Sequence, residues 1–400
     1  MLNSRDEFIS KKIDNGLTIY SNYLERPWCY VVFLINAGLR EQEKKGLAHL
    51  LEHVVIEDFA TDNGKFKNAV TGLLSTNVQL FYLTEGIDQE LVQEVADTLF
   101  KREIRQDTIE RQKELIFQEC KRKGVNKLKL KIREEKKRSL YPGSWVAGSV
   151  LGKWSEVKAI KKEDLQKFRR DYYNPENISI IFAGGIKPDK AFEMIESTDF
   201  TLERRGKKSY RPEPIISPEP PKNKKLVVRN SDYHKNSSGN FNTIGKVAKL
   251  SGKYSKATID IMEEIVGHSI KKELREKNRW TYSINLATIN FGPLYEFNFH
   301  CEFDSVSVNK IEEAIDSVLK EVKEKKDLFK SKKSGYLNYL LMRDYDVWDI
   351  CKMAMDDIEI YGRVRPKEEI MKDIEEVKFD DIKEIVESIR NKSWNLLIVP

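Results

Sequence analysis

The chain has 400 residues, of which 40% are hydrophobic and 34% are charged, and it contains no run of 18 apolar residues, which excludes an ordinary membrane-spanning helix. Its first residues lack the apolar stretch of a secretory signal, and its four cysteines have neither metal nor disulfide spacing, so we expect a protein of the cytoplasm that makes no contact with membranes. The 70 Lys and Arg residues are interleaved with 64 acidic residues, giving a net charge of +6, which argues against a dedicated nucleic-acid-binding protein.

Strands and helices are mixed in the first half of the chain. "GLTIYSN" (16–22) and "CYVVFLINAG" (29–38) are rich in Val, Ile, Phe and Tyr and predict β-strands. Two later segments, 91–100 and 108–123, have apolar residues at helical spacing and predict amphipathic helices. This mixture favours an α+β fold in which a sheet is layered with helices.

Between these strands and helices lies "GLAHLLEH" (46–53), a segment that has the composition of a buried helix but holds two of the five histidines. His49 and His53 are four residues apart, so on a helix their imidazoles lie on one face, one turn apart, where they can share a cation. Glu52 borders that face. The order His-x-x-Glu-His is the inverse of the thermolysin-like His-Glu-x-x-His motif. It predicts a zinc site at which Glu52 takes the proton of a water molecule and passes it to the leaving amine.

This motif has only three fixed positions, so it is also compatible with two core histidines and an exposed glutamate. The metal interpretation requires a third ligand on a neighbouring helix, and the helix predicted at 108–123 offers Glu110, Glu114 and Glu119. The basic segment that follows, 120–138, has two interpretations: the solvated face of a long helix, which we favour, or a basic wall that attracts acidic peptides.

The chain divides near its middle. "RPEPIISPEPPKNKK" (211–225) carries five prolines and predicts a semi-extended linker. On either side of it the chain repeats weakly, because 159–184 and 376–400 each contain an acidic turn, an amphipathic helix, an Asn and a short apolar strand. We therefore predict two homologous α+β domains, at 1–210 and 226–400, each with a mostly antiparallel sheet layered with helices.

Five segments in the same order resemble the pitrilysin/insulysin family of zinc peptidases, the inverzincins, and within it the small two-domain subfamily related to mitochondrial processing peptidase. The resemblance spans nearly the whole chain. The segments are "GLREQEKKGLAHLLEH" (38–53), "NAVTGLLSTN" (68–77), "ELIFQEC" (114–120), the stretch that closes the first domain (148–185) and "KKELREKNRWTYSI" (271–284).

The resemblance implies a zinc-dependent endopeptidase that cleaves short or unfolded peptides, with a role in maturing a peptide precursor as one option. It implies that Zn²⁺ is held by His49, His53 and Glu119, which selects Glu119 among the three candidates. Glu52 would act as base and then as acid.

The same resemblance implies how substrate is held. Asn68 and Ala69 would lie on an edge strand that pairs with the peptide. Arg275 and Tyr282, seven residues apart in the second domain, would hold the scissile carbonyl and its developing charge. The partner would be a second copy of the chain, or a related subunit, in a clamshell dimer in which each zinc centre faces the Arg/Tyr pair of the partner subunit.

Two features depart from the family pattern. The loop between His53 and Asn68 is shorter than usual, and Gln112 stands where the family often carries a second acid, which bears on the tuning of the zinc site. Two alternatives stay open: a non-catalytic or regulatory subunit of a related processing peptidase, and a structural zinc domain with a closed fourth ligand.

Overall fold

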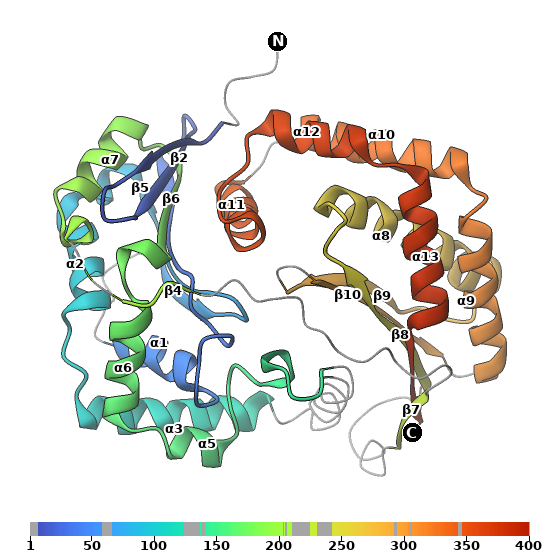
Figure 1. The fold of residues 1–400 in the computed structure, drawn as a ribbon, viewed down its shortest axis with the longest axis horizontal. Coiled ribbons are helices and arrows are strands. Elements are labelled where there is room, and N and C mark those ends of the chain that lie inside the picture. The colour runs from blue at the N-terminus through green and yellow to red at the C-terminus, as the bar shows by residue number, and fades with distance from the viewer. Residues whose placement is uncertain are drawn as a thin grey trace. The chain divides into compact units, whose positions relative to one another are not determined.

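The computed structural model describes residues 7–57, 66–123, 137, 141–202, 204, 206–209, 225–229, 242–291, 294–303, 306–342 and 346–399. These residues form two compact units (Figure 1). Unit 1 consists of Met1–Val125, Gly143–Arg211 and Asp344–Lys367, and unit 2 consists of Asn126–Pro142, Pro212–Arg343 and Glu368–Pro400. Most of the linker predicted at 211–225 lies outside the described residues, as does the basic segment after Lys123 except for position 137.

Unit 1 is built on a six-stranded sheet of order β1-β2-β6-β3-β5-β4. The pair β2–β6 is parallel and the other pairs are antiparallel, so the sheet is mixed but mostly antiparallel. Its strands are β1 (Ile9–Lys12), β2 (Thr18–Tyr23), β3 (Trp28–Ile35), β4 (Phe66–Thr71), β5 (Thr76–Leu83) and β6 (Ile178–Gly184).

Helices cover one face of this sheet and enclose the main core of unit 1. They are α1 (Leu47–Ile56), α2 (Gln89–Phe100), α3 (Gln106–Lys123), α5 (Trp154–Lys158), α6 (Lys162–Tyr172) and α7 (Pro188–Glu196). The helices predicted at 91–100 and 108–123 are therefore confirmed as α2 and α3.

The opposite face of the same sheet is covered by α11 (Val347–Tyr361), a helix from the second half of the sequence (Figure 1). Tyr30, Val32 and Leu34 of β3 pack against its apolar side, whereas Val31 and Phe33 face the main core. A strand buried on both faces has a continuous apolar run, which explains the sequence of β3. The division into units thus differs from two continuous halves, because α11 belongs to unit 1 although it lies in the second half of the sequence.

Unit 2 contains a five-stranded sheet of order β7-β11-β8-β10-β9 with a separate hydrophobic core. Its strands are β7 (Lys225–Arg229), β8 (Asn242–Ser251), β9 (Ile284–Asn290), β10 (Leu294–Phe303) and β11 (Trp394–Val399). The helices that pack with them are α8 (Lys256–Lys271), α9 (Val308–Val322), α10 (Lys326–Met342), α12 (Lys367–Glu376) and α13 (Phe379–Lys392). A π-helical turn, η8 (Lys272–Lys277), extends α8.

The two sheets repeat one topology. Without β1, the order β2-β6-β3-β5-β4 in unit 1 matches β7-β11-β8-β10-β9 in unit 2, and in each sheet only the first of these pairs is parallel. The weak sequence repeat falls on α6 with β6 and on α13 with β11. Each unit thus has the α+β arrangement expected from the sequence, a mixed sheet layered with helices, and α8 stands at the position in unit 2 that α1 occupies in unit 1.

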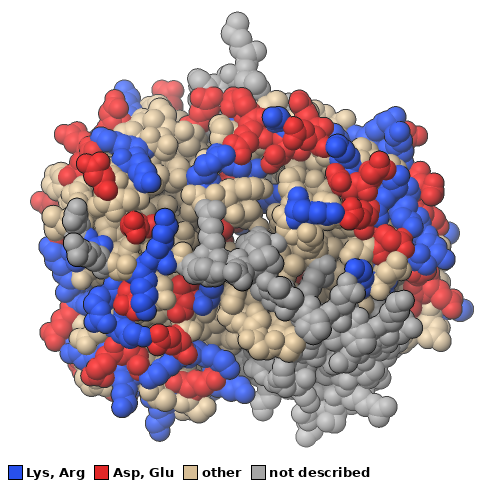
Figure 2. Space-filling view, viewed as in Figure 1, with Lys and Arg blue, Asp and Glu red and all other residues tan. Residues whose placement is uncertain are grey.

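The surface carries both signs of charge. In Figure 2, acidic and basic side chains are interspersed over the described part of the visible face. Many form exposed ion pairs, such as Lys44 with Asp164, which contribute little to stability individually. None of the described helices combines the length and the apolar character that crossing a membrane requires.

Candidate metal centre

Helix α1 is almost completely buried between the sheet and the other helices of unit 1. It begins after Gly46, whose positive φ of 85° favours glycine, and a Cβ there would lie 2.8 Å from the carbonyl oxygen of Leu151. His49 and Glu52 are themselves only 7% and 5% exposed. Burying such polar side chains is costly unless they are paired, so their presence on this helix indicates a site.

Three metal-ligating side chains converge where α1 packs against α3. The Nε2 atoms of His49 and His53 lie 3.6 and 4.0 Å from Oε2 of Glu119, and one ligand atom from each residue lies within 4.8 Å of the others. No other such group occurs among the described residues. The ligand atoms of a tetrahedral zinc are about 3.4 Å apart, because each is about 2.1 Å from the ion. The two imidazoles and the carboxylate therefore fit zinc in both chemistry and spacing.

The packing of α1 on α3 distinguishes Glu119 from the other two candidates. Glu110 and Glu114 are exposed, and their carboxylates accept hydrogen bonds from Gln106 and Gln118 of the same helix. The side chains of His53 and Glu119 keep 24% and 21% of their surface exposed, so water can reach the group of candidate ligands. An accessible centre is typical of catalytic rather than structural zinc.

Glu52 is held beside the three candidate ligands. Its Oε2 accepts a hydrogen bond of 2.6 Å from the hydroxyl of Thr71, the last residue of β4. Burial raises the pKa of Glu52, while the hydrogen bond from Thr71 opposes this shift. A carboxylate with a raised pKa next to a candidate metal centre is typical of a group that exchanges protons. Sequence reasoning assigned no role to Thr71, although its place in the predicted edge-strand segment 68–77 was an available signal.

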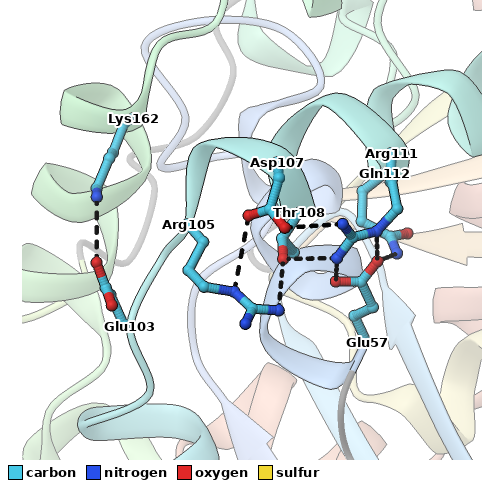
Figure 3. A network of polar contacts seen from close by, with 8 residues as sticks. All are labelled: Glu57, Glu103, Arg105, Asp107, Thr108, Arg111, Gln112 and Lys162. Carbon is cyan, nitrogen blue, oxygen red and sulfur yellow. Dashed lines mark hydrogen bonds and ion pairs between the residues drawn. The ribbon is translucent and has the colours of Figure 1, made fainter.

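A second set of polar contacts involves His53, and its outer part, formed by Gln112, Glu57 and Arg111, is drawn in Figure 3. Nδ1 of His53 lies 3.0 Å from Oε1 of Gln112, and the amide nitrogen of Gln112 donates to Glu57 at 2.9 Å. Glu57 in turn is bound by Arg111. The sequence marked Gln112 as a departure from the family pattern, but it gave no sign of a role for Glu57, which caps the C-terminal end of α1 four residues after His53.

The predicted substrate-binding residues of unit 1 lie on β4, which is an edge strand of its sheet. The side chain of Asn68 donates to Oε1 of Gln79 on the neighbouring strand β5, at 3.4 Å. Ala69 is half-buried and packs on the main core. The unpaired side of an edge strand offers backbone donors and acceptors to another extended chain.

Arg275 and Tyr282 lie together in unit 2. The guanidinium carbon of Arg275 is 4.9 Å from the centre of the Tyr282 ring, a cation–π contact. Tyr282 is 84% exposed, which is unusual for a large aromatic side chain. The two residues predicted as a substrate-binding pair are thus in contact with each other.

Comparisons of sequence identify relatives of the chain. Residues 159–335 match the family model described as the Peptidase M16 inactive domain. Over 227 residues, 53% of this chain and 54% of the relative, the chain is 24% identical to an uncharacterized zinc protease from Rickettsia felis. Over 198 residues, 46% of this chain and 39% of the relative, it is 25% identical to the beta subunit of mitochondrial-processing peptidase from Bos taurus. These alignments cover about half the length of the curated relatives or less.

Comparisons of structure extend over the whole chain. A protease from Helicobacter pylori superposes with a TM-score of 0.80 at 16% identity, covering 99% of this chain and all of the other. Pitrilysin superposes with a TM-score of 0.80 at 13% identity, covering 100% of this chain but only 45% of pitrilysin. The fold is thus that of half of a pitrilysin-type enzyme.

These similarities define a pitrilysin-like α+β chain. The chain is related to the M16 family of peptidases and to the subunits of mitochondrial processing peptidase. The matched family model begins after Glu119, so the candidate metal centre lies outside the segment that the model describes as inactive.

Proposed function

We propose that the chain is a zinc-dependent endopeptidase that cleaves short or unfolded peptides. The observation that carries the proposal is the convergence of His49, His53 and Glu119 around one point, with the buried carboxylate of Glu52 beside them. When bound, zinc supplies polarisation of the scissile carbonyl and lowers the pKa of water towards about 7.

The chain's own residues carry the remaining steps. Glu52, oriented by Thr71, takes the proton of the attacking water and then delivers it to the leaving nitrogen. The peptide adds as a further strand at β4, so that main-chain hydrogen bonds hold it. Arg275 and Tyr282 hold the scissile carbonyl and the charge that develops on its oxygen.

A strong zinc chelator should abolish peptidase activity while leaving the fold nearly intact. The candidate ligands lie on two helices that an extensive core already holds together, so the metal is a minor source of stability. Activity on a quenched-fluorescent peptide and the midpoint of thermal unfolding should be measured before and after chelation, and again after zinc is restored. A midpoint lower by tens of degrees would favour a structural zinc instead.

The active assembly that we propose is a homodimer in which each zinc centre works with Arg275 and Tyr282 of the partner subunit. Glu52→Gln and Tyr282→Phe dimers should then each be nearly inactive. A mixed dimer places both substitutions in one site and leaves the other intact, so its activity should approach half that of the wild type. Chains with different tags that copurify but recover no activity would show that the site is built within one chain.

A non-catalytic subunit is the alternative, because an M16 chain could serve as a partner of an active subunit. It predicts no turnover by the purified chain, even when the chain is fully loaded with zinc. Zinc content and turnover measured on one preparation therefore separate the two proposals.

A further inference from the structure

Gln112, Glu57 and Arg111 form a chain of polar contacts that ends on an ion pair (Figure 3), and Gln112 at its other end faces His53. Arg111 binds both carboxylate oxygens of Glu57, with Nε 3.0 Å from Oε1 and a terminal nitrogen 2.9 Å from Oε2. These hydrogen bonds lower the pKa of Glu57, so the carboxylate is ionised at neutral pH. An ionised carboxylate can only accept hydrogen bonds.

The orientation of Gln112 follows from that charge. Only the NH₂ group of its amide can donate to Glu57, so its carbonyl oxygen must face His53, as the distances of 2.9 and 3.0 Å show. A carbonyl oxygen only accepts, so Nδ1 of His53 must carry the proton. In the neutral imidazole Nε2 of His53 then keeps its lone pair, and this is the nitrogen on the side of Glu119.

We propose that Arg111, Glu57 and Gln112 form a positioning relay that sets the tautomer and the orientation of His53 for the metal. The inference rests on the zinc site proposed above and adds the residues that prepare one of its ligands. Groups that hydrogen-bond to a metal-binding histidine fix its ring and tune its affinity for the metal. The relay does this through a neutral amide, so it adds no charge directly beside the imidazole.

This arrangement makes positions 57 and 112 interdependent. In Gln112→Glu, a second carboxylate would face Glu57 across the 2.9 Å contact and the two charges would repel. In Glu57→Gln, the new amide could donate as well as accept, so the orientation of Gln112 would no longer be dictated. With both substitutions, the amide at 57 would donate to the carboxylate at 112. That carboxylate would accept the hydrogen bond from Nδ1–H of His53, as the original carbonyl does.

The test is a double-mutant cycle on zinc binding. The zinc dissociation constant is measured by competition with a chelator for wild type, Gln112→Glu, Glu57→Gln and the double variant. Glu110→Gln, an exposed acid on the same helix, is the matched control. The tautomer of His53 is read in the metal-free proteins from the ¹⁵N chemical shifts of labelled histidine, and thermal unfolding reports on the fold.

Each single variant should bind zinc about 10- to 100-fold more weakly than wild type. The double variant should return to within a factor of about two, while Glu110→Gln should leave zinc affinity unchanged. His53 should carry its proton on Nδ1 in the wild type and in the double variant. In Glu57→Gln it should be a mixture of the two tautomers. A merely structural effect would lower the unfolding midpoint without rescue by the second substitution.

Two results would overturn the relay: single variants that bind zinc like wild type, or losses that add in the double variant without rescue. If wild type binds no zinc, the proposed function fails, but the tautomer measured in the metal-free proteins still decides whether the relay exists. If wild type binds and cleaves while the substitutions show no coupling, only the relay fails.

Discussion

Glu52→Gln should retain zinc and lose peptidase activity by at least about 10²- to 10⁴-fold, the usual range for removing a general acid–base group. The amide has the shape of the carboxylate and can still accept the hydrogen bond from Thr71, so the buried pocket should keep its packing. It cannot take a proton from water at neutral pH. The loss should therefore appear in kcat rather than in metal content or folding.

The measurement needs zinc content, thermal unfolding and peptide turnover on the same preparation. Glu114→Gln, on the exposed side of α3, makes the same chemical change away from the site and should behave as wild type. A zinc-loaded Glu52→Gln protein with near-normal turnover would refute the proposed mechanism.

Glu119→Gln should have the second large effect, a marked loss of zinc affinity with activity falling in proportion to the zinc lost. A neutral amide is a poorer ligand for zinc than a carboxylate, and the two histidines alone leave the site one donor short. The fold should persist, because the side chain of Glu119 is partly exposed and its helix packs mainly through other residues.

Glu110→Gln and Glu114→Gln test the choice of ligand within the same helix. Both carboxylates point to partners on the surface of α3, so neither substitution should change zinc retention. If Glu114→Gln lost zinc while Glu119→Gln kept it, the third ligand would have been misassigned.

The sequence by itself determined what depends on local periodicity. His49, Glu52 and His53 share one helix, so a period of 3.6 residues per turn places both imidazoles on one face, whatever the rest of the chain does. The strands around 16–38, the helices α2 and α3, and the repeat seen in α6–β6 and α13–β11 were predictable for the same reason. Each depends on neighbours within a few turns or on a pattern repeated along the chain.

The tertiary structure decided what depends on segments far apart in the sequence. Spacing alone left Glu110, Glu114 and Glu119 equivalent, and the packing of α3 on α1 places the third of them with His49 and His53. Thr71 of β4 contacts Glu52, and Gln112 of α3 contacts His53. Nothing in the sequence of the His-x-x-Glu-His motif indicates which strand or helix packs against it. The apolar run of β3 required cover on both faces, but only the folded chain shows that α11, more than 300 residues later, supplies it. Local periodicity predicts which side of a helix or strand is buried, whereas long-range packing determines which segment covers that side.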